Sequence, residues 1–132
     1  MAYYCMQCWN EIDEAVTVCP SCGADQKALT EEPFVQKLLR ALRHPEPETP
    51  IRAAYVLGKL RAREGVLELI RLMHESPDPY IAAACAEALG EIGGTTAFDS
   101  LRSVLTRDCP LPVWRAAEKA LQRFAAACTN HD

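Results

Sequence analysis

The chain has 132 residues, of which 49% are hydrophobic, and a formal net charge of −4. This length allows one ordinary hydrophobic core and a small satellite module, and it excludes a second large domain. The acidic balance argues against nucleic acid as the natural partner, because phosphate binding needs clustered Lys and Arg.

The composition also bears on the compartment. No apolar run approaches the ~20 residues that cross a bilayer, and the start, Met1-Ala-Tyr-Tyr-Cys5, lacks the basic and then apolar layout of a signal peptide. The seven cysteines are an odd number with four in close pairs, which favours metal binding in a reducing compartment over a disulfide framework. We therefore expect a cytoplasmic protein with no membrane partner.

Residues 1–28 contain two C-x-x-C pairs, Cys5-Met-Gln-Cys8 and Cys19-Pro-Ser-Cys22. The segment between the pairs, from Trp9 to Val18, mixes β-formers with turn residues, so we expect it to form a short hairpin that brings the four thiolates around one tetrahedral ion. A segment this short cannot build a core, so the metal must supply its folding energy. All four ligands come from the protein, which leaves no open position for catalysis and indicates a structural ion.

These pairs, with Gly23 after the second, resemble the short zinc ribbons at the N-termini of many prokaryotic proteins, over residues 3 to about 26. The resemblance implies one structural Zn²⁺ held by Cys5, Cys8, Cys19 and Cys22. Trp9 departs from the pattern, because these ribbons usually have glycine there, and this raises the question of the geometry of the first turn. Iron in the same four thiolates and a redox dithiol are the alternatives.

A polar connector is expected at 24–31. The second domain, residues 29–132, is predicted to be helical. Helix starts are marked by Thr30 with Pro33, by Asp78-Pro79 and by the further prolines Pro50 and Pro112, since proline is tolerated in a first turn. Thr96 and Asp99 fit a capping box. The predicted helices span 32–43, 50–62, 65–74, 79–92, 96–106 and 112–126.

Three leucines recur every 32 residues at Leu57, Leu89 and Leu121, each within an alanine-rich helix that follows another amphipathic helix. Each helix pair cannot bury its apolar face alone, so the pairs must stack. The predicted fold class is all-α, an α-α superhelix of three HEAT-like helix pairs preceded by a small zinc-ribbon β-hairpin module. Small residues beside the first two leucines, Gly58 and Gly90 among them, should let the next pair pack closely.

Pro79-Tyr-Ile-Ala-Ala-Ala-Cys-Ala-Glu-Ala-Leu-Gly90-Glu-Ile and its two partners resemble the short HEAT-like repeats named for phycobilin lyases, over about residues 32 to 126. The resemblance is informative about fold and weakly informative about activity. A related enzyme, deoxyhypusine hydroxylase, takes iron ligands from His-Glu pairs on such helices. The corresponding positions here are Ile51-Arg52, Ala83-Ala84 and Arg115-Ala116, which excludes that chemistry. His44 and His74 are expected to be solvated turn residues.

Counted from the repeated leucines, two stripes emerge on the second helix of each pair. One is the expected core: Ala53, Val56, Leu57, Leu60, Cys85, Ala88, Leu89, Ile92, Ala117, Ala120, Leu121 and Phe124. The other should line a concave surface with charges that alternate between repeats. Lateral salt bridges between neighbouring helices are one interpretation of this stripe, and a recognition surface is the other.

The functional prediction is a non-enzymatic adaptor that binds another protein, as a monomer or as a weak dimer through the C-terminal face. The candidate partner-binding residues are Tyr55, Lys59, Glu87, Glu91, Trp114, Arg115, Lys119 and Arg123. Two alternatives stay open. One is nucleic-acid or transcription-associated binding through the ribbon, and the other is a tetrapyrrole (phycobilin) lyase-like accessory role.

Overall fold

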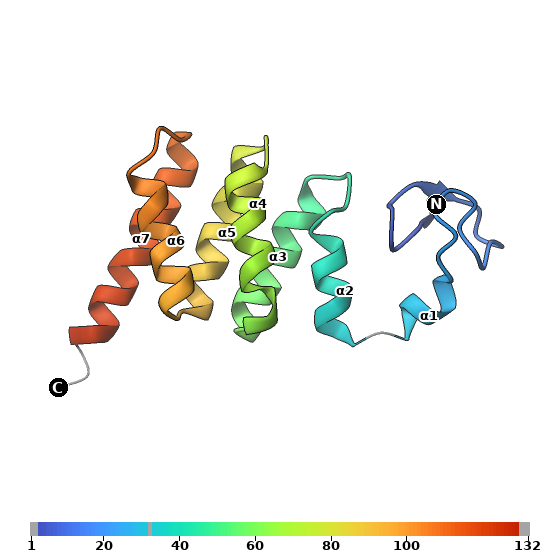
Figure 1. Cartoon of the computed structure of the whole chain (residues 1–132), viewed down its shortest axis with the longest axis horizontal. Coiled ribbons are helices and arrows are strands. Elements are labelled where there is room, and N and C mark those ends of the chain that lie inside the picture. The colour runs from blue at the N-terminus through green and yellow to red at the C-terminus, as the bar shows by residue number, and fades with distance from the viewer. Residues whose placement is uncertain (1–2, 32, 130–132) are drawn as a thin grey trace.

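The computed structural model describes residues 3–31 and 33–129, with side chains only as far as Arg123 and without that of Thr30. Its elements form an elongated row, with the cysteine-rich segment at one end and α7 at the other (Figure 1). In chain order they are β1 (Tyr3–Tyr4), β2 (Glu11–Ile12), α1 (Gln26–Thr30), α2 (Phe34–Ala41), α3 (Glu48–Leu60), α4 (Val66–Glu75), α5 (Pro79–Ile92), α6 (Thr95–Leu105) and α7 (Leu111–Thr129). Among the described residues, none of the helices is both long and apolar enough to cross a membrane.

The two strands pair differently from the expected hairpin. β1 and β2 are antiparallel, with Tyr3 opposite Ile12 and Tyr4 opposite Glu11, so they enclose the first cysteine pair. The second pair is enclosed by an isolated bridge between Val18 and Asp25. The prediction of a hairpin within Trp9 to Val18 is therefore wrong, because this segment crosses from one cysteine loop to the other.

The short helix α1 replaces the polar connector that we expected at 24–31. Asp25 begins it, since its carboxylate accepts a hydrogen bond from the backbone N–H of Lys27 at 3.0 Å. An aspartate that accepts such a bond satisfies one of the free N–H groups in the first turn. Only five residues follow in helical conformation, too few for a periodic apolar pattern to reveal them.

The remaining helices pack in pairs, α2 with α3, α4 with α5 and α6 with α7. The pairs stack side by side, so that α5 lies between α3 and α7 in one layer, while α4 contacts α6 in the other (Figure 1). The element order and the pairing confirm the predicted fold class. A small N-terminal β-hairpin precedes three helix pairs in an α-α superhelix.

Helix starts and ends follow from local residues. The Asp78 carboxylate caps α5 by accepting a hydrogen bond from the Tyr80 N–H at 2.9 Å, and Pro79 opens the first turn. Gly93 and Gly94 take φ values of 77° and 99° and follow Ile92, the residue at which the helix was predicted to end. The capping box expected at Thr96 is wrong, because α6 begins at Thr95 with Gly94 at the cap and no side-chain cap bond.

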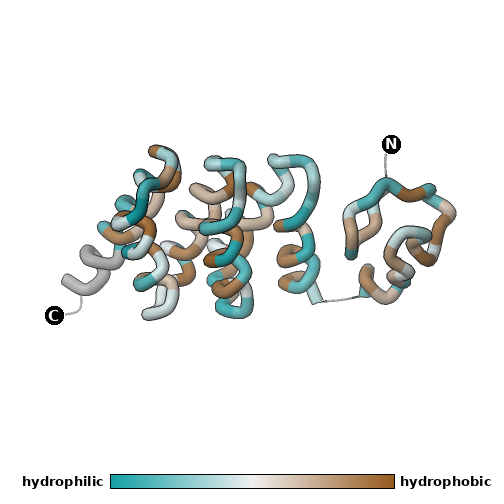
Figure 2. The backbone as a smooth tube through the Cα atoms, turned by 45° about the horizontal axis from the view of Figure 1, so that its top comes forward, coloured by the Kyte–Doolittle hydropathy of each residue, from teal (hydrophilic) through white to brown (hydrophobic). Residues whose placement is uncertain are grey.

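The core lies within the helical array. Leu57, Leu69, Leu89, Leu101 and Val104 are fully buried, and each such side chain contributes about 1.5–3 kcal/mol relative to an exposed one. Figure 2 shows hydrophobic and hydrophilic stretches alternating along these helices, as amphipathic packing requires. Cys85 is buried among them, and its burial raises the pKa of the thiol to about 12, which keeps it an inert packing residue.

One member of the expected core is exposed, and the side chain of another is not among those that the structure describes. Leu60 is 50% exposed, because it is the last residue of α3 and the chain turns away at Arg61. The Phe124 side chain lies outside the described side chains. The other positions of the stripe are buried or half-buried.

Glycines set how closely the pairs stack. A Cβ atom on Gly58 would lie 3.0 Å from the Cα of Ala88, and one on Gly90 would lie 2.6 Å from the Cβ of Ala120. Neither contact leaves room for a methyl group, so α3, α5 and α7 approach one another where glycine meets alanine.

Candidate metal centre and groove

The two cysteine pairs lie in loops with the same hydrogen bonds. In the first, Trp9 N donates to Cys5 O at 2.9 Å and Cys5 N to Asn10 O at 2.9 Å. In the second, Gly23 N donates to Cys19 O at 2.9 Å and Cys19 N to Ala24 O at 3.0 Å. Trp9 takes the left-handed conformation, with φ 61°, at the place where Gly23 has φ 77°. The tryptophan therefore leaves the geometry of the first turn intact.

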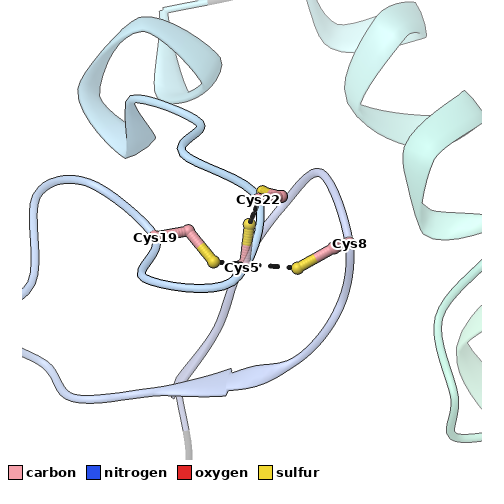
Figure 3. Close-up of side chains that lie close together, drawn as sticks. All are labelled: Cys5, Cys8, Cys19 and Cys22. Carbon is pink, nitrogen blue, oxygen red and sulfur yellow. Dashed lines mark hydrogen bonds between the residues drawn. The ribbon is translucent and has the colours of Figure 1, made fainter.

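The four sulfur atoms converge between these loops (Figure 3). All lie within 4.8 Å of one another, with Cys5 and Cys22 at 3.5 Å and Cys8 and Cys19 at 3.7 Å. Four thiolates around one ion at Zn–S distances near 2.3 Å would have their sulfurs about 3.8 Å apart. The four cysteines could therefore hold a metal ion, and the donor set suits a soft or borderline cation.

Several N–H groups point at these sulfurs. Gln7 N donates to Cys5 Sγ at 3.3 Å and Ser21 N to Cys19 Sγ at 3.4 Å. Gln26, in the first turn of α1, donates from its Nε2 to Cys5 Sγ at 3.2 Å and accepts from Met6 N at 3.0 Å. The sequence did not indicate Gln26, because a glutamine four residues after a cysteine pair resembles any linker residue.

These contacts shift the pKa values of the thiols in opposite directions. Burial opposes ionisation of Cys5, but N–H groups of Cys8, Gln7 and Gln26 lower its pKa to about 6. The N–H of Ala24 favours the thiolate of Cys22, yet desolvation and the other three sulfurs raise the pKa of Cys22 to about 12. Four thiolates so close together repel one another, and a bound cation would remove this penalty.

The N-terminal segment that contains the four cysteines, here called the cysteine module, also contacts the helical array. The indole Nε1 of Trp9 donates to the carbonyl of Arg40 at 2.8 Å, and the Arg40 guanidinium donates to Gln7 Oε1. His44 lies between two rings, with centroids 4.7 Å from Trp9 and 5.1 Å from Tyr4. The expectation that His44 is a solvated turn residue is wrong, because two aromatic rings cover it.

His74 is not a purely solvated turn residue either. Its Nδ1 lies 2.6 Å from a guanidinium nitrogen of Arg107. Partial burial lowers the pKa of His74, and the nearby Arg107 cation lowers it further. The histidine therefore links the end of α4 to the loop after α6.

A groove with a volume of about 250 Å³ runs across α3, α5 and α7. Its floor is apolar and small, built from alanines of α5 and α7, and its sides carry larger side chains of both charges. The residues lining it are Ile51, Tyr55, Lys59, Ala84, Glu87, Ala88, Glu91, Ala116, Lys119, Ala120 and Arg123. The groove lies where the sequence predicted a concave stripe.

Charges at one end of the groove are satisfied across the three helices. A single oxygen of Glu91, Oε1, contacts Arg123 at 2.6 Å and Lys59 at 3.4 Å. The hydrogen bond from Arg123 is the main cause of the lowered pKa of Glu91, and the charge of Lys59 adds to it. Lys59 Nζ also lies 5.3 Å from the centre of the Tyr55 ring. Part of the stripe thus forms the lateral salt bridges that were one interpretation of it.

Comparison with known protein families matches residues 35–122 to HEAT repeats. The chain belongs to the HEAT-repeat family. The match is to HEAT repeats in general and does not single out the phycobilin-lyase subset. No curated protein and no solved structure matches the chain. HEAT repeats commonly serve protein interaction, and no Ser, Cys or His lines this groove among the described residues.

Six of the eight candidate partner residues line the groove of the HEAT array, namely Tyr55, Lys59, Glu87, Glu91, Lys119 and Arg123. Trp114 and Arg115 lie outside it, in the first two turns of α7, with the Trp114 side chain 36% exposed. Sequence reasoning placed Ile51 on the concave stripe, where the groove has it, but did not count it among the partner residues, and it missed the alanine floor. Small apolar residues look like core in a sequence, although the groove reaches them.

Proposed function

We propose that the protein is a non-enzymatic adaptor whose HEAT array binds a segment of another protein in the groove across α3, α5 and α7. The observation that carries the proposal is a pair of uncompensated charges in the middle of this groove. Within the described part of the chain, neither Glu87 nor Lys119 forms an ion pair, while Glu91 beside them is bonded to two cations. Charged groups left unpaired next to an apolar floor are available for a partner.

The charges also indicate what such a partner carries. Glu87 on α5 calls for a cation and Lys119 on α7 calls for an anion, so the segment must present both signs to neighbouring helices. Between them, Ala88 and Ala120 leave space for apolar side chains, and Tyr55 offers an exposed ring. A peptide segment with an apolar contact flanked by opposite charges meets these requirements, and charge complementarity would fix its orientation.

The test is affinity capture from cells of the source organism, quantified by mass spectrometry, with a charge-reversed groove. The double variant Glu87→Lys, Lys119→Glu keeps the net charge and should lower recovery of the true partner roughly tenfold, about 1.4 kcal/mol. The control is Arg63→Glu, Asp99→Lys, at exposed positions outside the groove. Circular dichroism should show equal helicity. Equal recovery of every captured protein by both double variants would contradict the proposal.

We also propose that the four cysteines hold one structural zinc ion. Support comes from the sulfur spacing, from the N–H groups directed at the sulfurs and from the lack of other buried residues in this segment. Up to Leu29, the buried hydrophobic residues among those described are Cys5, Cys19 and Leu29 itself. Structural zinc in small modules contributes roughly 10–16 kcal/mol of apparent folding free energy, enough to replace a core.

The metal is tested by elemental analysis of protein purified under reducing conditions without chelators. We expect about one zinc per chain and negligible iron. The Cys19→Ser variant should lose this stoichiometry, whereas Cys85→Ser, which removes a thiol from the array core, should keep it. Metal-free wild-type protein, or iron in place of zinc, would contradict the assignment.

A further inference from the structure

The N-terminal edge of the HEAT array is weakly buried. No residue of α2 is buried, whereas α4 contains Leu69 and Met73 and α6 contains Ala97, Leu101 and Val104. α2 packs on α3 and on the short 3₁₀ turn Arg63–Gly65, and no further helix pair covers its outer side (Figure 1). Terminal repeats of solenoids need a cap, because an uncovered helix loses half of its packing partners.

The cysteine module contacts this edge at the C-terminal end of α2. The Trp9 indole donates to the carbonyl of Arg40 in the last turn, which also accepts a hydrogen bond from Arg43 N at 3.0 Å. His44 follows the helix and lies against the rings of Tyr4 and Trp9. All these contacts come from the first cysteine loop and its strand, residues 4–9, which contain Cys5 and Cys8.

Trp9 can reach Arg40 only while this loop keeps its shape. Its backbone φ of 61° is unfavourable for a residue with a Cβ, by roughly 1 kcal/mol. The bonds Trp9 N to Cys5 O and Cys5 N to Asn10 O hold it in place. Since this segment has almost no apolar core, the loop depends on whatever holds the cysteines together.

We propose that the cysteine module is the N-terminal cap of the HEAT array, and that Trp9 makes the ordering of α2 depend on the metal in the four-cysteine site. The inference rests on the proposed zinc and goes beyond the adaptor role. It assigns to Trp9 the role of linking the metal site to α2. Trp9 occupies the position in the first cysteine loop that Gly23 occupies in the second.

The test is hydrogen exchange at α2 in the full-length protein, with and without its metal. In the loaded wild type, amides of residues 38–44 should be protected, and removal of the metal by a strong chelator should speed their exchange at least tenfold. Amides of α5, in the next helix pair of the array, should not change. In Trp9→Gly, which keeps a residue suited to the left-handed turn, metal content should match the wild type. Its loaded form should already exchange fast at α2, with little further effect of chelation.

Trp114→Ala is the matched control, since it removes the other tryptophan and should leave α2 protection and its metal dependence unchanged. The inference is overturned if metal is lost while α2 protection stays the same, or if loaded Trp9→Gly protects α2 as the wild type does. Protein that takes up no metal at all would instead overturn the zinc assignment. Metal content, measured in every sample, separates the two failures.

Discussion

Two residues other than glycine, Trp9 and Arg61, have left-handed backbone conformations among the described residues. Trp9 gains contacts with the array from this conformation. Arg61, with φ 51°, ends α3 through bonds from its N–H to Gly58 O at 3.0 Å and from Ala62 N to Leu57 O at 3.1 Å. This is the arrangement of a Schellman motif, in which glycine is usual. The exposed arginine side chain gains no contact with the described residues that offsets the backbone cost.

Arg61→Gly should therefore stabilise the protein by about 0.5–1 kcal/mol, because glycine adopts this conformation without a Cβ clash. The increase would be measured as a higher midpoint of urea unfolding with an unchanged slope. Arg63→Gly, two residues away where φ is not positive, should have the opposite sign. Equal effects of the two substitutions would rule out backbone strain at Arg61.

At the scale of elements, sequence periodicity predicted the array well. The helix expected at 79–92 is found at Pro79–Ile92, because Asp78, Pro79 and the paired glycines mark both ends locally. α1 and β1 could not be predicted this way, since elements of five and two residues carry no period. Their formation depends on the fold of the cysteine loops rather than on local propensity.

The contact between α5 and α7 predicts whether a glycine-to-alanine substitution stabilises or destabilises the protein. In an exposed helix, glycine to alanine gains about 1 kcal/mol. In Gly90→Ala, the new Cβ would lie 2.6 Å from the Cβ of Ala120, so one backbone must move and we expect a loss of about 1–3 kcal/mol. Thermal unfolding followed by circular dichroism measures it. Adding Ala120→Gly should recover part of the loss, and a purely additive double variant would count against this contact as the cause.

At the scale of the whole molecule, two parts are stabilised in different ways. The array has a continuous apolar cluster from Leu42 to Ala120, whereas the cysteine module converges on four sulfurs. The spacing of the cysteines was enough to predict their convergence. The contact between the two parts was not predictable, because Trp9 and Arg40 are 31 residues apart and a tryptophan beside a cysteine pair has no pattern that identifies its partner.

The sequence predicted the groove as well as it predicted the array that forms it. A period of 32 residues placed equivalent positions of three helices on one face, and six of the eight chosen residues line the groove. The sequence could not show that Glu91 is shared by two cations while Glu87 has none, because side-chain pairing depends on the distance between helices.

That distance is set by single methyl groups. Ala88 and Ala120 each pack against the glycine of the preceding repeat on one side and form the groove floor on the other. The spacing of the repeats therefore also sets the spacing of the charged groups along the groove. A partner would be selected by whether its side chains match this spacing. A change at Gly58 or Gly90 could then alter which partner binds without touching a charged residue.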